Sequence, residues 1–364
     1  MSRFSRGEAP APEGYGYRAL AALVRTTLDA GVSVLVTGHP GVGKSALAAE
    51  VAADMGLPLV DLRLAQREPA ELCGVYFPDR DAQSLQLLAP PWAAAVCDAP
   101  ALLFLDEINA AVTRLHQAAA FQLVLERRVG PRCLHPGTRV LAAGNLLEDG
   151  PVVSPLASAL RNRFAHFRLR VCVEDWLAWA EDAEVAPVIV AYMRAHPHRA
   201  EGLLYDPSDD NAFPSPRTWA MAGRLYARGA PEARRRLVAA CVGVKAAEAF
   251  FNFLALYGRL DPVKVIADGR VVDFTRGRNS DPSFAHAAVW AIVDWVKAQP
   301  AFEPAWSEGM TRFLEAPGLD PEHAVVLLRA VAERPDVRGA LDAHPRFRAF
   351  AGELVQTMVG FDAL

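Results

Sequence analysis

The chain has 364 residues, of which 52% are hydrophobic and 22% are charged, a composition typical of a soluble globular protein with a sizeable core. Its formal charge of −4 gives no support to a general nucleic-acid binder. The five cysteines are scattered and form no C-x-x-C pair, which indicates a reducing compartment and argues against a disulfide framework or a zinc site.

Residues 1–13 are polar and contain proline, glycine and serine, so we expect a flexible lead-in without the apolar core of a signal peptide. No apolar run reaches the length of a membrane span. The sequence therefore predicts a cytoplasmic protein without membrane insertion.

The first predicted helix covers residues 18–30, where leucine and valine recur at helical spacing. Tyr15 and Tyr17 stand just before it, and they would either floor an adenine pocket or pack as ordinary core residues. An apolar run over 32–37 follows and predicts the first β-strand.

A glycine-rich segment over 38–45 follows this strand and precedes an alanine-rich predicted helix. It matches the pattern G-x-x-x-x-G-K-S/T, and the order strand, turn, helix is that of a phosphate-binding loop. Lys44 is predicted to reach the β- and γ-phosphates, and the Ser45 hydroxyl to bind Mg²⁺. The predicted phosphate-binding residues are Gly38, His39, Pro40, Gly41, Val42, Gly43, Lys44, Ser45 and Ala46.

A second strand is predicted over 57–62, and residues 63–92 then form a connection too long for a simple loop. We interpret it as an insertion with short elements of its own. It is either a working surface or a surface excursion packed by aromatic residues, namely Tyr76, Phe77 and Trp92.

The third predicted strand, 101–105, is continuously apolar, as expected for a strand buried on both faces of a parallel sheet. It ends in Asp106 and Glu107, and ligands of α/β sheets bind at this end of the strands. Asp106 is predicted to hold Mg²⁺, and Glu107 to act as general base on the attacking water. The alternative is that Asp106 or Asn109 caps a helix predicted over 110–126.

A hairpin-sized excursion is predicted over 127–137, before a fourth strand over 139–144 that ends in Asn145. Asn145 would orient water against the γ-phosphate, or it is simply a turn residue. A fifth strand is predicted over 166–173. Just before it, Arg161 and Arg163 are either solvated or reach the γ-phosphate bound by a neighbouring subunit.

The remainder of the chain is predicted to be helical, with a polar boundary over 268–281. Arg217 stands in the first turn of a predicted helix, where the helix dipole is unfavourable to a cation. This position predicts an anionic partner, such as a nucleotide phosphate. The alternative is an ordinary surface arginine.

Taken in this order, the motifs resemble those of AAA+ ATPases and, within that group, the MoxR-like ATPases of the dynein-related type, over roughly residues 14–260. The resemblance implies Walker A roles for Lys44 and Ser45, and Walker B roles for Asp106 as metal ligand and Glu107 as catalytic base. It further implies sensor 1 for Asn145, the arginine finger for Arg163 with Arg161 as second choice, and sensor 2 for Arg217.

The fold implied is an α/β P-loop NTPase core with a five-stranded parallel sheet, followed by an all-helical lid and a helical C-terminal region. The predicted boundaries are 1–13 for the lead-in, 14–173 for the core, 174–270 for the lid and 271–364 for the C-terminal region. Within the core, 63–92 resembles the helix-2 insertion and 127–137 the hairpin before sensor 1. Both face the central pore of a ring in the family.

The resemblance implies an ATP-hydrolysing enzyme with ATP and Mg²⁺ as cofactors, which forms a homo-oligomer, expected to be a hexameric ring. It would act as a chaperone that remodels or activates a partner protein, such as one bearing a von Willebrand factor A domain. Two alternatives stay open. One is a nucleic-acid-directed motor or loader, for which a basic cluster near the hairpin is the only candidate, and the other is a nucleotide-dependent switch with little turnover. The cluster comprises Arg127, Arg128, Arg132 and Arg139.

Overall fold

The computed structural model describes residues 14–79, 83–110, 113–149, 155–183, 185–196, 200–208, 211–280 and 282–361. The predicted lead-in, 1–13, lies outside the described residues. The chain divides into two compact units, Met1–Asp175 and Trp176–Leu364, and each is described by itself.

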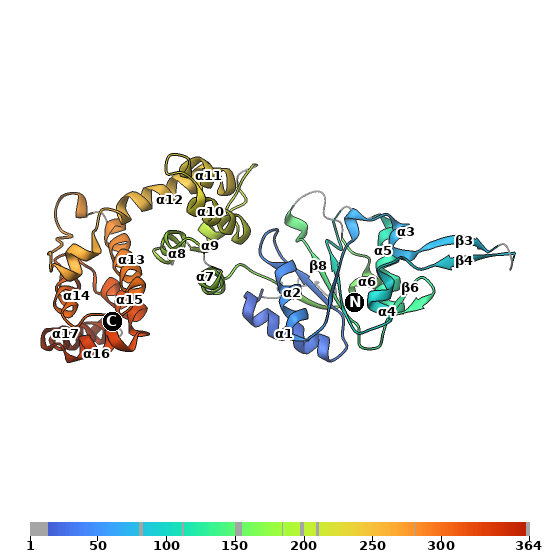
Figure 1. Cartoon of the computed structure of the whole chain (residues 1–364), viewed down its shortest axis with the longest axis horizontal. Coiled ribbons are helices and arrows are strands. Elements are labelled where there is room, and N and C mark those ends of the chain that lie inside the picture. Colours follow the sequence, from blue (N-terminus) through green and yellow to red (C-terminus); the bar gives the residue numbers. More distant parts are fainter. Residues whose placement is uncertain are drawn as a thin grey trace, which may run out of the picture. The chain divides into compact units, whose positions relative to one another are not determined.

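The first unit is built on a five-stranded sheet in the order β2-β5-β8-β1-β9 (Figure 1). All neighbouring strands pair in parallel, which confirms the predicted five-stranded parallel sheet. The strands are β1 (Val34–Thr37), β2 (Leu59–Arg63), β5 (Leu102–Asp106), β8 (Arg139–Gly144) and β9 (Ala165–Arg168).

Strand β9 is shorter than the predicted fifth strand over 166–173. It pairs residue for residue with β1, and both strands end at the pair Thr37–Arg168. The predicted strand was too long. The apolar alternation of the sequence continues beyond Arg168, but the partner strand β1 ends at Thr37.

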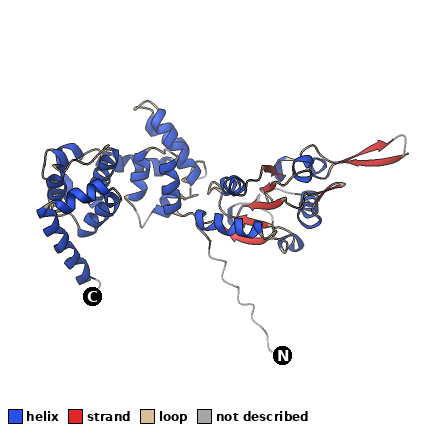
Figure 2. Cartoon of the chain, turned by 60° about the horizontal axis from the view of Figure 1, so that its bottom comes forward, coloured by secondary structure: helices blue, strands red, loops and turns tan. Residues whose placement is uncertain are grey.

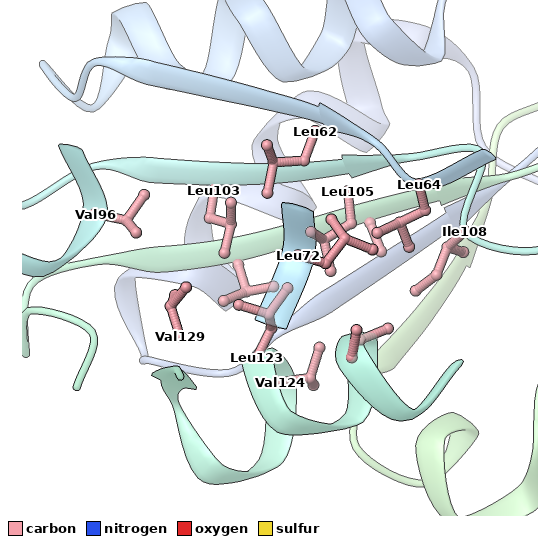
Figure 3. Close-up of a cluster of buried hydrophobic side chains, with 14 of the residues drawn as sticks. Leu62, Leu64, Leu72, Val96, Leu103, Leu105, Ile108, Leu123, Val124 and Val129 are labelled. Atoms are coloured by element: carbon pink, nitrogen blue, oxygen red, sulfur yellow. The ribbon is translucent and has the colours of Figure 1, made fainter. Parts of the chain in front are cut away.

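Helices connect these strands. The helices of the sheet layer are α1 (Tyr17–Asp29), α2 (Lys44–Asp54), α4 (Ala93–Cys97), α5 (Arg114–Phe121), the π-helix η2 (Gln122–Glu126) and α6 (Ser158–Arg161), and a 3-10 turn, η3 (Leu147–Asp149), follows β8. Every residue of β5 is buried. Figure 3 shows Leu103 and Leu105 of this strand packed with Leu72 and with Leu123 and Val124 of η2. This apolar layer fixes the strand that carries the predicted carboxylates.

The helix predicted over 110–126 begins later, at Arg114. Its N-cap is Thr113, whose hydroxyl accepts from the His116 N–H at 3.5 Å. The capping alternative for Asp106 and Asn109 is therefore wrong, because the residues after β5 form a turn and not a helix start.

The predicted insertion, 63–92, contains elements of its own, as expected. They are η1 (Leu64–Gln66), α3 (Pro69–Cys73) and an antiparallel hairpin of β3 (Val75–Asp79) and β4 (Ser84–Leu88). Figures 1 and 2 show this hairpin projecting from the rest of the first unit. A second, smaller hairpin follows η2 within the predicted stretch 127–137, with strands β6 (Arg128–Val129) and β7 (Arg132–Cys133).

The described residues of the second unit form helices and no strand (Figure 2). The predicted helix or pair over 231–257 is a pair, separated at Gly243. The helices are α7 (Val173–Asp182), which begins before the unit boundary, then α8 (Pro187–Arg194), α9 (Ala200–Leu204), α10 (Pro216–Arg228), α11 (Arg234–Val242), α12 (Val244–Tyr257), η5 (Val263–Ala267), η6 (Gly277–Ser280), α13 (Pro282–Ala298), α14 (Trp306–Leu314), α15 (Pro321–Ala332), α16 (Pro335–Ala343) and α17 (Pro345–Phe361).

Aromatic residues hold α8, α10 and α12 together. The ring of Tyr192 lies 5.8 Å from Trp219 and 5.4 Å from both Phe250 and Phe253, measured between ring centroids. The side chains of Tyr192, Trp219 and Phe250 are almost completely buried. Contacts of this kind add to the hydrophobic stabilisation of a core. Among the described residues, no helix is both long and apolar enough to cross a bilayer.

Candidate functional site

The glycine-rich loop joins β1 to α2, as the sequence predicts. Gly43 precedes α2 in a left-handed conformation, with a φ of 108° that residues with a side chain rarely adopt. The helix then begins at Lys44, so the first N–H groups of α2 and its positive dipole end face the loop. This arrangement suits an anion such as phosphate.

Lys44 links the loop to the end of strand β8. Its ammonium group donates to the carbonyl oxygens of Gly38 at 2.6 Å and His39 at 2.9 Å, and to Oδ1 of Asn145 at 2.8 Å. The side chain is thus held above the loop, between two strand ends. Lys44 and Asn145, which were predicted from separate motifs of the sequence, therefore meet within hydrogen-bond distance.

Ser45 and Asp106 form the second contact across the site. The Ser45 hydroxyl donates to Oδ2 of Asp106 at 2.9 Å, and Asp106 is only 7% exposed. A hydroxyl beside a carboxylate provides the hard oxygen ligands that Mg²⁺ prefers. The donor set of this pair therefore fits the predicted metal.

Glu107 follows directly and has an unusual backbone. Its φ of 55° lies in the left-handed region, and its N–H donates to Oδ1 of Asp106 at 2.9 Å. A non-glycine residue in this region is held there by its surroundings, a feature that is frequent at functional sites. The turn directs the chain away from β5 immediately after the two carboxylates.

Asn109 is a site residue that the sequence indicated only as a possible helix cap. Its side-chain amide donates to the carbonyl oxygen of Asn145 at 2.8 Å, and its Oδ1 accepts from the Asn145 N–H at 3.0 Å. The position of Asn109 three residues after Asp106 was visible in the sequence. Its contact with Asn145 depends on the pairing of β5 with β8 and was not.

A second contact missed by the sequence analysis joins the loop to the segment after Asn145. Nδ1 of His39 lies 2.6 Å from Oδ1 of Asp149, whose other oxygen accepts from the Leu146 N–H at 2.8 Å. The Asp149 side chain is nearly buried, at 7% exposure. His39 within the motif and the acidic Asp149 were visible, but nothing in the sequence indicated that they meet.

The two tyrosines before α1 differ in environment. Tyr17 donates a hydrogen bond to Glu50 at 2.8 Å, and burial, followed by that bond, raises the pKa of its phenol. Tyr15 is 39% exposed and packs edge-on against Phe167 at 6.0 Å. The structure thus gives Tyr17 a hydrogen-bond partner and Tyr15 a packing partner, and the adenine-pocket interpretation stays a prediction.

Among the described residues of the first unit, the predicted arginines Arg161 and Arg163 take no part in this hydrogen-bonded set. Arg161 is the last residue of α6, and Arg163 lies between α6 and β9, which is an edge strand of the sheet; both arginines are exposed. Arg217 belongs to the second unit, where it is exposed in the first turn of α10 after the N-cap Ser215. The site residues within the first unit thus divide into a hydrogen-bonded group and an exposed pair.

Residues 34–170 match the family described as "ATPase family associated with various cellular activities (AAA)". The chain contains an AAA ATPase domain. The matched residues run from the first residue of β1 to just beyond β9. They include the phosphate loop, the two carboxylates, Asn145, Arg161 and Arg163.

Similar solved structures include a variant of Thermotoga maritima RuvB, 14% identical with a TM-score of 0.39, over 71% of this chain and 78% of that chain. A candidate ATPase of Cytophaga hutchinsonii is 14% identical with a TM-score of 0.36, over 90% and 88% of the two chains. NtrX from Brucella abortus is 15% identical with a TM-score of 0.34, over 92% and 68%. Likeness at this level carries no argument about function. No curated protein matches the chain.

Proposed function

We propose that this chain is a MoxR-like AAA+ ATPase that binds ATP with Mg²⁺ and hydrolyses it to ADP and phosphate. The observation that carries this proposal is the contact set at the carboxyl ends of three adjacent strands. Lys44 contacts Asn145, and Ser45 contacts Asp106, within an AAA ATPase domain. A cation, a metal-ligand pair and a polar amide are the parts that phosphoryl transfer from a nucleotide requires.

Each side chain has a distinct role in this proposal. Lys44 binds the β- and γ-phosphates, and Glu107 orients water for in-line attack on the γ-phosphate as its general base. Mg²⁺ held by Ser45 and Asp106 would offset charge on the phosphate oxygens. Asn145 would hold the attacking water or the γ-phosphate. The catalytic effect is mainly positioning and electrostatic stabilisation.

Exposure of Arg163 and Arg161 supports a site shared between subunits. Both side chains are exposed beside an edge strand, where a neighbouring chain can approach them. An arginine supplied by a neighbour stabilises charge in the transition state. We therefore propose a homo-oligomer, expected to be a ring of six, with Arg163 as the finger, Arg161 as the second choice and Arg217 as sensor 2 of the lid.

The hairpin of β3 and β4 supports a protein as the partner. Its apolar side chains are unusually exposed, with Val75 at 53%, Tyr76 at 68%, Phe77 at 61% and Leu85 at 67%. Neighbouring residues of a strand point to opposite faces, so both faces of the hairpin carry apolar groups. Contiguous exposed apolar surface marks interaction sites. We propose that the enzyme remodels or activates a protein client, such as one with a von Willebrand factor A domain.

Local contacts engage the guanidinium groups of Arg127, Arg128 and Arg132, which weakens the support for the nucleic-acid alternative. Arg127 donates to the carbonyl oxygen of Thr138 at 2.7 Å, and burial lowers its pKa. Arg128 donates to the carbonyl oxygen of Pro131 at 2.7 Å, and Arg132 forms a salt bridge with Asp98. A groove that binds nucleic acid presents its cations to phosphates instead.

The decisive experiment compares ATP turnover and ATP affinity in the wild type and in Glu107→Gln. Turnover should fall by about 10²–10⁴-fold, the usual contribution of a general base, while affinity is retained. Wild-type turnover in the variant would remove Glu107 from this role. If neither protein hydrolyses ATP, alone or assembled with a partner, the switch alternative replaces the ATPase proposal.

The shared site has its own test, in which Arg163→Ala subunits are mixed with Glu107→Gln subunits. Each variant alone should be inactive, and the mixture should regain part of the activity because one interface combines an intact Arg163 with an intact Glu107. Light scattering must first show that both variants assemble. Assembled mixtures that exchange subunits and remain inactive would contradict a finger acting between chains.

A further inference from the structure

The Asn109 side chain makes two hydrogen bonds to the backbone of Asn145. Its amide group donates to the Asn145 carbonyl oxygen at 2.8 Å, and its Oδ1 accepts from the Asn145 N–H at 3.0 Å. Asn109 is 7% exposed, so these bonds are protected from water. A buried amide with both ends satisfied fixes the groups that it binds more firmly than a surface contact does.

The double contact continues the pairing of two strands beyond their last backbone pair. Strands β5 and β8 are in register as far as Leu105 and Ala142, and the Ile108 N–H then donates to the Ala143 carbonyl oxygen at 2.9 Å. One residue further, Asn109 supplies a donor and an acceptor as a strand backbone would. The Asn109 side chain therefore forms the hydrogen bonds that the backbone of β5 would form if the chain had not turned away at Glu107.

The backbone leaves just enough room for this contact at Gly144. A Cβ atom at position 144 would lie 2.8 Å from Oδ1 of Asn109, closer than such atoms approach in proteins, and 3.0 Å from its Cγ. All three nearest atoms belong to Asn109. A glycine before the sensor asparagine is therefore required by Asn109 itself.

We propose that Asn109 is a positioning residue that sets the direction of the Asn145 side chain during ATP hydrolysis. Asn145 is held through its backbone, and its Oδ1 accordingly meets Nζ of Lys44 at 2.8 Å. Asn109 acts through the backbone of Asn145. This inference rests on the proposed ATPase function and on the role of Asn145 in it.

A double-mutant cycle tests the inference with Asn109→Ala, Asn145→Ala and the combined variant. Turnover of Asn109→Ala should fall by about 10–100-fold, because a small misplacement of a catalytic group costs up to about 10²-fold. ATP affinity should stay within about threefold of the wild type. The combined variant should be no slower than Asn145→Ala, since residues that act as a unit are not additive. The proposal would be overturned if the turnover losses of the two single variants multiplied in the combined variant. A loss of ATP affinity in Asn109→Ala that matched its loss of turnover would also overturn it.

Asn109→Asp provides an isosteric second variant in case the alanine variant folds poorly. Aspartate keeps the acceptor for the Asn145 N–H but places an oxygen against the Asn145 carbonyl, so turnover should again fall while the shape is preserved. Full activity of Asn109→Asp would contradict the proposal. Gly144→Ala should also slow turnover, and its loss of thermal stability should shrink in the Asn109→Ala background, where the clash is absent.

Failure of this inference is distinguishable from failure of the proposed function. Wild-type turnover no higher than that of Glu107→Gln would remove both, together with any role for Asn109 in hydrolysis. Normal wild-type turnover combined with an unaffected Asn109→Ala variant would remove only the positioning role.

Discussion

The two units use their buried polar side chains differently. In the first unit, Asp106 and Asn109 are buried and bind groups on other elements, the phosphate loop and the end of β8. In the second unit, buried Ser215 caps α10 and buried Thr311 bonds the Ser307 carbonyl within its own helix, α14. Asp106 and Asn109 thus meet at one edge of the sheet, whereas Ser215 and Thr311 form hydrogen bonds at the start of their helix or within it.

This difference explains why chemistry can be assigned to one unit and not to the other. A polar side chain that is satisfied within its own helix compensates for its burial and does little else. One that reaches across elements brings distant segments into fixed geometry, as sites for ligands and catalysis require. The second unit carries Arg217 as its one residue of the proposed machinery.

Lys44→Ala should have the largest effect of these substitutions, and this effect should be limited to the first unit. The variant removes the charge and the donors that meet Gly38, His39 and Asn145, and with them the contact with phosphate. ATP binding should no longer be detected by titration calorimetry at concentrations that saturate the wild type. Ser33→Ala, a replacement outside the loop and just before β1, serves as control. Unchanged ATP affinity in Lys44→Ala would show that this loop is not the phosphate site.

Phe250→Ala should instead weaken the second unit without touching the nucleotide. Phe250 is fully buried among Tyr192, Trp219 and Tyr226, and loss of such a ring costs about 3–5 kcal/mol of unfolding free energy. The same replacement at exposed Phe77 should cost less than about 0.5 kcal/mol. Urea denaturation measures both values. Equal losses at the two positions would break the contrast between an aromatic core and an exposed hairpin.

The parts of the site that the sequence predicted share one property: their signal is local. A continuous apolar strand followed by Asp106 and Glu107, and a complete phosphate-loop motif, each lie within a few residues. Because carboxyl ends of parallel strands meet at one edge, the contacts of Lys44 with Asn145 and of Ser45 with Asp106 agree with that expectation.

The parts that the sequence missed depend on which strands are neighbours. Asn109 had an equally good local interpretation as a helix cap, but Asn145, 36 residues away, takes its hydrogen bonds and leaves Thr113 to cap α5. The contact of His39 with Asp149 spans 110 residues in the same way. Strand β9 ends early because its neighbour β1 has only four residues. Local patterns contain no information about such partners.

The smallest predicted effect concerns a partly buried carboxyl group of the second unit. Asp294 accepts a hydrogen bond from the Tyr257 hydroxyl at 2.7 Å, and burial raises the pKa of Asp294 even though that bond, Arg194 and Lys297 act to lower it. The folded chain therefore holds this proton more tightly than the unfolded chain does. Its contribution to stability is complete below the unfolded pKa, near 4, and is lost as the pH rises through the folded value.

Asp294→Asn should consequently be more stable than the wild type at pH 7, by less than about 1 kcal/mol, and should show no such advantage near pH 4. Asparagine still offers an oxygen to the Tyr257 hydroxyl, so the hydrogen bond is preserved while the charge is removed. Urea denaturation at the two pH values gives the comparison, with exposed Asp342→Asn on α16 as the matched control. The opposite result would be a loss of stability in Asp294→Asn, relative to the wild type, that is larger at pH 7 than at pH 4. It would mean that Arg194 and Lys297 stabilise the charged Asp294 carboxylate more than burial opposes it. The helical unit would then hold one buried charge pair that bridges elements, and the contrast with the sheet edge would weaken at that point.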